Sequence, residues 1–247
     1  MDLLHAVNAF WAQDCRSLYH LNCVFMVLLK KKDHPEEIKD FRPINLMHSF
    51  GKLITKCMAN RLARTLDQLV LRNQSAFIKG RSIHDNFRDV QVACKAIHSR
   101  RLTCMLLKID LARAFDSVAW VFLLDVLRHL GFELRWRNWL SNILSTSSTR
   151  ILLNGKPGRR ICHARGLRQG DPLSPMLFVL VMEVLNRLLC WIEINGFLTP
   201  IDGLPGNRVS LYVDDLVIFV IPTERELLAV KAALGIFGLA SGLFSNL

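Results

Sequence analysis

The chain has 247 residues, 51% hydrophobic and 21% charged, which excludes a disordered or collagen-like chain and predicts one large domain or two small ones. Its 32 Lys and Arg residues outnumber its 21 Asp and Glu residues, and the net charge of +11 indicates a polyanionic partner, either nucleic acid or an acidic membrane surface. The most apolar stretch, Met176 to Ile192, carries Glu183, Asn186 and Arg187. It therefore predicts a buried helix and not a membrane span.

The N-terminal sequence has no basic segment followed by a cleavage site, so we expect a protein that is not secreted. Seven cysteines are scattered along the chain, and no two of them form a C-x-x-C pair. Several lie in apolar periodic segments, which favours reduced core thiols over a disulfide framework or a zinc site. We therefore expect an intracellular protein, in the nucleus or the cytoplasm. No basic amphipathic helix with a wide apolar face is clear in the sequence, so no membrane partner is expected.

No repeat, low-complexity segment or linker divides the chain, so we expect one continuous unit with two lobes, the first ending near residue 100. This first lobe opens with an apolar strand over Val24 to Leu29, which ends at the lysines Lys30 to Lys32. Apolar residues at helical spacing then predict a helix over Gly51 to Leu71.

The second lobe begins with an apolar strand over Met105 to Ile109. Ser117 is the expected N-cap of a helix whose apolar stripe runs from Trp120 to Leu130, and Gly131 is its expected C′ residue. A further amphipathic helix is expected to follow, through Trp136 and Ile143.

Asn154-Gly155 is a strong signal for a hairpin turn. Ser174 and Pro175 are the expected N-cap and N1 residues of the long apolar helix. Two short apolar arms then surround a pair of aspartates over residues 209–220, and a last helix is expected over 224–239. Strands that alternate with helices in this order predict an α+β fold with a sheet of the split βαβ kind.

Two carboxylate features lie where apolar strands end, namely Asp110 and the adjacent pair Asp214 and Asp215. Ionised aspartates in such a place are costly unless a cation neutralises them. If the two strands are neighbours, these carboxylates could share two divalent ions, as in-line phosphoryl transfer requires, and Mg²⁺ suits such an all-oxygen site. The alternative is that the pair only forms a tight hairpin turn.

Three segments follow one another in the order and spacing of reverse transcriptases: LKIDLARAFDSV at 107–118, GLRQGDPLSP at 166–175 and YVDD at 212–215. Upstream, FRPINL at 41–46 and NQSAFIKGRS at 73–82 resemble segments of non-LTR (LINE-type) retrotransposons of the sort found in plant genomes. The resemblance covers nearly the whole chain. It implies a right-hand polymerase architecture, with residues 1–100 mainly fingers, residues 101–247 mainly palm with a ferredoxin-like split βαβ sheet, and the thumb missing.

The resemblance implies that Asp110, Asp214 and Asp215 are catalytic metal ligands, and that the backbone carbonyl of Leu111 completes the ion on the nucleotide side. Phe115 matches the aromatic gate that sits against the sugar and favours deoxynucleotides. The alternative for this side chain is a phenylalanine of the hydrophobic core.

Gln169 and Gly170 match the loop that shapes the nucleotide pocket and touches the template, and glycine permits close approach of a backbone to a ligand. Arg42, together with Lys31 and Lys32, fits the finger surface that grips the incoming triphosphate. For the two lysines, a solvated basic turn is the alternative.

Lys79 and Arg81 resemble the region that contacts template RNA, and Arg168 is a further candidate for template binding. The chain departs from the family pattern at Val213, where alanine is commoner, and at Leu29, where proline is usual. It also ends where the family continues toward a lysine and then the thumb, so the resemblance implies fingers and palm of a longer polyprotein.

The function implied is that of an RNA-directed DNA polymerase, which extends a primer 3′-OH with deoxynucleotides on an RNA template, using two Mg²⁺ ions or Mn²⁺ as a substitute. The partners expected are therefore an RNA template, a DNA primer and dNTPs. A truncated, non-catalytic remnant that still binds nucleic acid through its basic residues is the alternative. Template choice and oligomeric state do not follow from the sequence.

Overall fold

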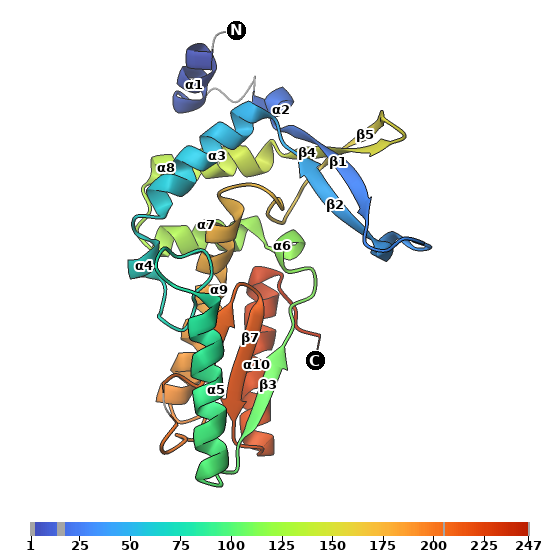
Figure 1. Ribbon diagram of the computed structural model, residues 1–247. Coiled ribbons are helices and arrows are strands. Elements are labelled where there is room, and N and C mark those ends of the chain that lie inside the picture. Colours follow the sequence, from blue (N-terminus) through green and yellow to red (C-terminus); the bar gives the residue numbers. More distant parts are fainter. Residues whose placement is uncertain (1–2, 14–17, 205, 247) are drawn as a thin grey trace.

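The computed structural model describes residues 3–13, 18–204 and 206–246, and its two lobes are each built around one β-sheet (Figure 1). Helices pack around both sheets, which confirms the α+β class expected from the sequence. One continuous hydrophobic core runs through both lobes, from Phe50 and Leu62 in the first to Phe178 and Val220 in the second.

The first sheet has the strand order β2-β1-β4-β5. β1 is antiparallel to β2 and parallel to β4, and β4 and β5 form the predicted hairpin, whose turn residues Asn154 and Gly155 both have positive φ (50° and 77°). Because β4 and β5 lie beyond residue 100, the two lobes are interleaved along the chain. The bounds are β1 (Cys23–Lys30), β2 (Phe41–Leu46), β4 (Ser148–Leu153) and β5 (Lys156–Cys162).

The second sheet has the order β3-β7-β6, with β3 (Met105–Ile109), β6 (Val209–Tyr212) and β7 (Asp215–Val220). β7 lies in the middle and is antiparallel to both neighbours, so β3 and β6 run parallel with one strand between them. This is the split βαβ arrangement that the element order predicts.

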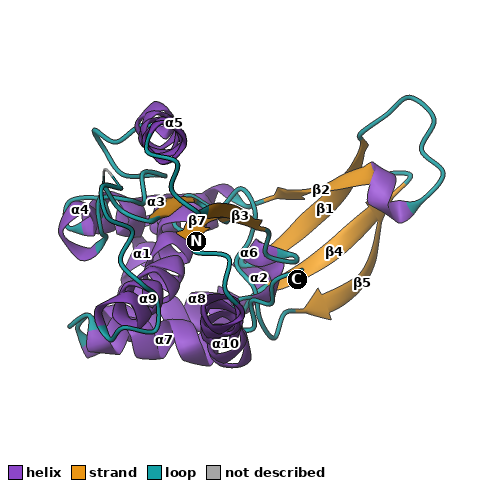
Figure 2. Cartoon of the chain, turned by 90° about the horizontal axis from the view of Figure 1, so that it is seen from below, coloured by secondary structure: helices purple, strands orange, loops and turns teal. Residues whose placement is uncertain are grey.

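The longest helix, α9 (Ser174–Ile194), connects the two halves of this motif and is buried along most of its length, as its apolar residues on all sides require. Figure 2 shows α5 (Ile83–Ser99) on one face of the second sheet, and α9 with α10 (Glu224–Ser241) on the other. α7 (Trp120–His129) packs against α9 and α10. The sheet is thereby covered on both faces.

The remaining helices flank the first sheet or connect the lobes: α1 (Leu3–Trp11), α2 (Leu18–Leu21), η1 (Ile38–Asp40), α3 (Ser49–Leu62), α4 (Leu66–Leu69), α6 (Ala114–Ser117) and α8 (Leu134–Ser145). Across the ranges described, none of the helices combines the length and the apolar character that a membrane crossing requires.

The single helix predicted over Gly51 to Leu71 is wrong, because the structure has two helices there, α3 and α4, with a turn over residues 63–65. The hydroxyl of Thr65 donates to the Leu62 carbonyl (3.2 Å), and this local bond competes with continuation of the helix. The predicted C-terminal end of α7 is confirmed, since Gly131 follows the C-cap of this helix and has a φ of +81°.

Two predicted helix caps are wrong. Ser117 is the last residue of α6, and the N-cap of α7 is Ala119. Ser174 is the first residue of α9, and the cap position falls on Leu173. The carboxylate of Asp171 accepts the N–H of Leu173 (2.9 Å), but no side chain among the described residues caps the first turn of α9.

The expectation of core thiols is wrong for the cysteines that can be placed. Six are free, and each is exposed or half-buried: Cys23, Cys57, Cys94, Cys104, Cys162 and Cys190. Cys15 lies outside the described residues.

The loop after β5 docks on α6 through Gly166. The Gly166 N–H donates to the Val118 carbonyl (2.8 Å), and the Gly166 carbonyl accepts the indole N–H of Trp120 (2.7 Å). Gly166 has φ +86°, and a Cβ at this position would lie 2.6 Å from the carbonyl oxygen of Asp116. Glycine is therefore required here both by backbone conformation and by space.

We predict that Gly166→Ala lowers the free energy of unfolding by about 2–5 kcal/mol, the sum of left-handed strain and overpacking. Gly170→Ala is the matched control, because its φ is +91° but nothing lies within 4 Å of the added Cβ. This control should lose only the strain contribution, about 1–2 kcal/mol. Urea unfolding followed by circular dichroism measures both, and equal losses would contradict the close contact with Asp116.

Candidate active site

β3 and β7 lie side by side (Figure 1), and their pairing brings the three aspartates to one end of the second sheet. Ile109 lies opposite Leu216, so the next step of the same antiparallel register places Asp110 opposite Asp215. Asp214 lies in the turn between β6 and β7, at the same end. Residues more than a hundred positions apart in sequence thus meet at one edge, as the sequence predicts for neighbouring strands.

The turn that carries the aspartate pair is strained. Tyr212 pairs with Asp215, which leaves Val213 and Asp214 as a two-residue turn. Val213 has φ +59°, a conformation that a β-branched residue rarely adopts and that costs about 1–3 kcal/mol. A positive φ at the first of two turn residues is typical of a type II′ hairpin, where glycine is the usual residue.

The carboxylates influence one another. Burial raises the pKa of Asp214, and the negative charges of Asp215 and Asp110 raise it further, while Lys108 opposes them. The carboxylate of Asp215 forms an ion pair with the Lys108 ammonium (3.2 Å) and is exposed. The site therefore concentrates negative charge, with one lysine close to it.

Leu111 follows the first aspartate and has a buried side chain. It forms an isolated antiparallel bridge with Ser245, in which the N–H of Ala112 donates to the Phe244 carbonyl (2.9 Å). No hydrogen bond to the Leu111 carbonyl occurs among the residues described. This carbonyl is thus free to act as the ligand that the resemblance implies.

Over the described part of the chain, no three His, Cys, Asp or Glu side chains form a group that could hold a metal ion. Asp110, Asp214 and Asp215 nevertheless share one edge, and carboxylates with a backbone carbonyl are the hard oxygen donors that Mg²⁺ prefers. The residues fit a divalent ion in donor chemistry and in position, and they do not form a preformed cluster.

Phe115 packs against the hydrophobic core and is also partly exposed. Its ring stacks on that of Phe178, with 4.5 Å between centroids and 18° between planes, and Phe178 is fully buried. Phe115 itself is half-buried, so one side of the ring packs on the core. Gln169 and Gly170 are exposed in the adjoining loop, where the Gln169 carbonyl accepts a long hydrogen bond (3.5 Å) from the amide of Asn45 in β2.

The three basic candidates of the first sheet differ in their contacts. The Lys31 ammonium donates to the Lys39 carbonyl (2.8 Å), and that of Lys32 pairs with Asp40 (3.0 Å). Arg42 is exposed on β2 and has no side-chain partner among the described residues. Of the three, Arg42 is the one whose cation is free for a ligand.

Arg168, a candidate for template binding, lies inside the protein. Its guanidinium is buried and donates to the side chain and to the carbonyl of Asn22, and its Nε has no partner among the described residues. Burial lowers its pKa to about 10, an effect that Asp171 opposes. Arg168 therefore braces the loop against the start of β1, a role that its charge alone does not reveal.

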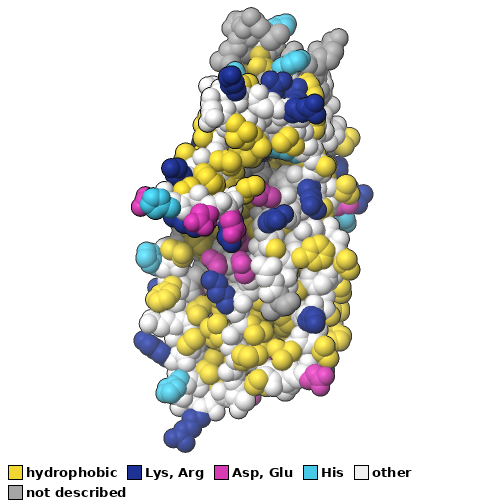
Figure 3. Space-filling model, turned by 90° about the vertical axis from the view of Figure 1, so that its right-hand side faces the viewer, with side chains coloured by type: hydrophobic (Ala, Val, Ile, Leu, Met, Phe, Trp, Pro, Cys, Tyr) yellow, Lys and Arg dark blue, Asp and Glu magenta, His cyan; other side chains and the backbone are white. Residues whose placement is uncertain are grey.

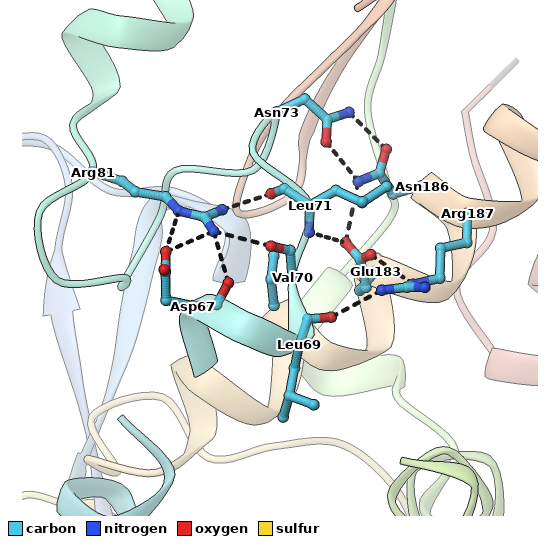
Figure 4. Close-up of polar contacts among 9 residues, drawn as sticks. All are labelled: Asp67, Leu69, Val70, Leu71, Asn73, Arg81, Glu183, Asn186 and Arg187. Carbon is cyan, nitrogen blue, oxygen red and sulfur yellow. Dashed lines mark hydrogen bonds and ion pairs between the residues drawn. The ribbon is translucent and has the colours of Figure 1, made fainter. Parts of the chain in front are cut away.

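Arg81 is also committed within the chain (Figure 4). Its guanidinium donates to the Asp67 carboxylate (2.8 Å) and to the carbonyls of Val70 (2.9 Å), Leu71 (2.6 Å) and Gln74 (2.7 Å). Its side chain is only 9% exposed. Arg81 therefore organises the segment from α4 to residue 74 and does not present its charge to RNA, whereas Lys79 is exposed.

Polar side chains of α9 join this helix to the same segment. In the sequence, they indicate only that the helix does not span a membrane. Asn73 and Asn186 exchange two amide hydrogen bonds (2.7 and 2.8 Å), as Figure 4 shows. The carboxylate of Glu183 accepts the N–H of Leu71 (3.2 Å) and pairs with Arg187 (2.8 Å). Polar residues inside an apolar helix indicate that a polar network exists, but the sequence does not show which residues are their partners.

We predict that Arg81→Lys lowers the free energy of unfolding by about 2–4 kcal/mol, because one ammonium cannot reach the carbonyls that the planar guanidinium bonds. Arg64→Lys is the control, since Arg64 is exposed and has no side-chain partner among the described residues. Urea unfolding measures both variants. A loss no larger for Arg81 than for Arg64 would contradict the structural role.

We also predict that Asp214→Asn raises the melting temperature of the metal-free protein at neutral pH, by on the order of 2 °C. The fold raises the pKa of Asp214, so its ionised form destabilises the fold, and this cost develops as the pH rises through and above the ordinary carboxyl range. Wild type and variant should therefore converge near pH 3. Thermal unfolding in the presence of a chelator, from pH 3 to neutral pH, measures the difference in melting temperature. Asp202→Asn is the control, because Asp202 is exposed.

Residues 29–246 match the family model "Reverse transcriptase (RNA-dependent DNA polymerase)". The chain is 32% identical over 192 residues to a "Retrovirus-related Pol polyprotein from type-1 retrotransposable element R2" of Nasonia vitripennis, covering 78% of this chain and 18% of that protein. The corresponding R2 polyprotein of Popillia japonica is 29% identical over 192 residues, covering 77% and 26%. The chain thus spans about a quarter or less of these relatives.

Among solved structures, apo telomerase from Candida Tropicalis truncated from its C-terminal domain superposes with a TM-score of 0.62 at 12% identity, over 98% of this chain and 54% of that one. This likeness confirms the expected polymerase fold of fingers and palm. The resemblance to non-LTR retrotransposon enzymes is confirmed by the R2 relatives. The chain belongs to the reverse transcriptase (RNA-dependent DNA polymerase) family.

Proposed function

We propose that this chain is the fingers-and-palm unit of an RNA-directed DNA polymerase, which extends a primer 3′-OH with dNTPs on an RNA template. The observation that carries the proposal is the meeting of Asp110 with Asp214 and Asp215 at one edge of the second sheet, in a chain of this family. We assign residues to about 100 mainly to the fingers and residues 101–247 mainly to the palm, with β4 and β5 completing the fingers sheet.

Asp110 and Asp214 would be the main ligands of two divalent ions, with Asp215 and the Leu111 carbonyl completing the donor set. Mg²⁺ is the expected ion and Mn²⁺ a substitute, because all these donors are oxygens. When bound, such ions lower the pKa of an attacking hydroxyl and stabilise a leaving pyrophosphate. Burial and the neighbouring carboxylates raise the pKa of Asp214, and a bound cation would act in the opposite direction by favouring its ionised form.

The nucleotide would lie against the half-buried ring of Phe115 and the exposed loop at Gln169 and Gly170. The stacking of Phe115 on Phe178 supports a sugar gate, because a ring fixed from behind can exclude a 2′-hydroxyl by its position. Arg42, which has no intrachain partner among the described residues, is the proposed contact to the triphosphate.

A nucleic-acid partner is supported by the net charge of +11. Figure 3 shows acidic side chains gathered near the middle of one face, with Lys and Arg side chains around them. This distribution fits a polyanion held by the surrounding cations while its reacting end approaches the carboxylates. Lys79 is the proposed template contact, and Lys31 and Lys32 stay weaker candidates because both have intrachain partners.

The test is primer extension on an RNA template with dNTPs and Mg²⁺ or Mn²⁺. We predict extension by the wild type and a loss of at least about 100-fold in Asp110→Asn and in Asp214→Asn, as expected when a group that stabilises transition-state charge is removed. Asp202→Asn is the control, since this residue is exposed and lies outside the site motifs.

Extension that survives both aspartate variants would contradict the proposal. Salt-sensitive RNA binding without incorporation by the wild type, measured in the same buffers, would select the alternative of a nucleic-acid-binding remnant. Lys79→Ala should weaken RNA binding, and by a smaller factor as the salt concentration rises, because a phosphate contact releases counterions.

A further inference from the structure

The turn that presents the aspartate pair is held in a conformation that its own sequence disfavours. Val213, at φ +59°, precedes Asp214 and Asp215, so the direction of both carboxylates depends on this residue. A strained residue keeps such a conformation only where its surroundings determine it. The contacts around Val213 therefore decide how rigidly the carboxylates are presented.

The segment that meets this turn is 73–75, which lies along the free edge of β6. The N–H of Leu211 donates to the Asn73 carbonyl (2.9 Å), and the N–H of Ser75 donates to the Leu211 carbonyl (3.4 Å). These bonds make a parallel bridge between Gln74 and Leu211, two residues before Val213. This pairing places the side chain of Gln74 next to Val213, the first residue of the turn.

That side chain is Gln74, which is buried, with 1% exposure. Its carboxamide oxygen accepts the N–H of Val213 (3.3 Å) and that of Ala76 (3.0 Å), and its amide nitrogen lies 3.5 Å from the Val213 carbonyl oxygen, at the limit of a hydrogen bond. The carboxamide of Gln74 therefore contacts both the N–H and the carbonyl of Val213, as the backbone of a neighbouring strand would.

The backbone segment 73–75 that carries Gln74 is itself held by hydrogen bonds. The Gln74 carbonyl is bonded by Arg81, and Asn73 is bonded reciprocally to Asn186 of α9. The amide of Asn86 in α5 also donates to the carbonyls of Asn73 (3.1 Å) and Leu211 (2.7 Å). Helices on both faces of the sheet thus hold the segment in place.

We propose that Gln74 is a positioning residue of the aspartate site: its carboxamide holds the main chain of Val213 in the left-handed conformation and so fixes Asp214 and Asp215 for metal binding. This inference rests on the proposed polymerase function for its catalytic consequence, but not for the contact itself. Gln74 touches neither substrate nor ion and acts through the turn.

The wild type gives a first test by amide hydrogen exchange, read by NMR. Val213 and Asn154 both occupy the first position of a two-residue hairpin turn with positive φ, but the Asn154 N–H has no acceptor among the described residues. We expect the Val213 amide to exchange at least about tenfold more slowly, as one hydrogen bond allows. Equal rates, after correction for sequence, would overturn the proposal.

The variants separate hydrogen bonding from side-chain volume. Gln74→Met keeps the length but loses both bonds to Val213 and the bond to Ala76, whereas Gln74→Glu keeps an acceptor for the Val213 N–H. Gln68→Met is the matched control, because Gln68 is exposed in α4 and its side chain has no partner among the described residues. We expect exchange at Val213 to rise about tenfold in Gln74→Met, less in Gln74→Glu and not at all in Gln68→Met.

Binding of Mn²⁺ alone, measured by electron paramagnetic resonance, gives a readout that needs no turnover. We expect affinity to fall severalfold in Gln74→Met, and to fall less when Val213→Gly is also present, because glycine adopts a positive φ without strain. In primer extension, Gln74→Met should lower kcat and leave the KM for dNTP unchanged. Wild-type affinity and kcat in a folded Gln74→Met variant would overturn the proposal.

The two proposals fail separately. If the wild type extends no primer while Val213 exchange and Mn²⁺ affinity still respond to Gln74→Met, the polymerase proposal fails and the role of Gln74 stands. If the wild type extends primers and Gln74→Met changes none of the three readouts, the role of Gln74 fails and the polymerase proposal stands. Should Gln74→Met not fold, the wild-type comparison of Val213 with Asn154 decides.

Discussion

The antiparallel pairing of β3 with β7 is the constraint on which the site depends, because it sets like charges against each other at one end of the sheet. Like charges repel each other, and the repulsion is stronger near a protein surface than in water. One register step away, Ile109 and Leu216 are almost fully buried, and each contributes about 1.5–3 kcal/mol. Apolar packing therefore holds the strands together against the repulsion of the carboxylates.

The polar residues of α9 extend this arrangement to the first lobe. Glu183 and Asn186 lie in a helix that is otherwise apolar, and buried polar groups are tolerated only when they are bonded. Their partners are backbone and side-chain groups of residues 71–73, the stretch that leads to the edge of β6. The bonds that satisfy the helix thus also place the segment that contacts the aspartate turn.

The sequence predicts the parts of the fold that depend on local signals. Strand ends at Asp110 and Asp214, the Asn154-Gly155 turn and the long helix were all readable, and the motif order identified the aspartates as a set. Pairings between distant segments were not, since nothing local shows that β4 lies parallel to β1. For the same reason, a charge pattern cannot separate Arg42 from Arg81 and Arg168. Arg42 has no side-chain partner among the described residues, whereas Arg81 and Arg168 are bonded inside the chain.

Under the proposed function, the carboxylates of the site would repel its substrates unless metal ions are bound. A triphosphate and a nucleic acid are both anionic, and Asp110, Asp214 and Asp215 repel them, with Lys108 as a partial counterion. Surface cations attract a polyanion over about 10 Å at most at ordinary salt, which brings it to the face but does not cancel the local repulsion. Two divalent cations would outweigh three carboxylates and invert the sign of the site. The net positive charge of the chain would therefore attract the polyanion, while the aspartates at the strained turn would hold the metal ions that allow it to approach.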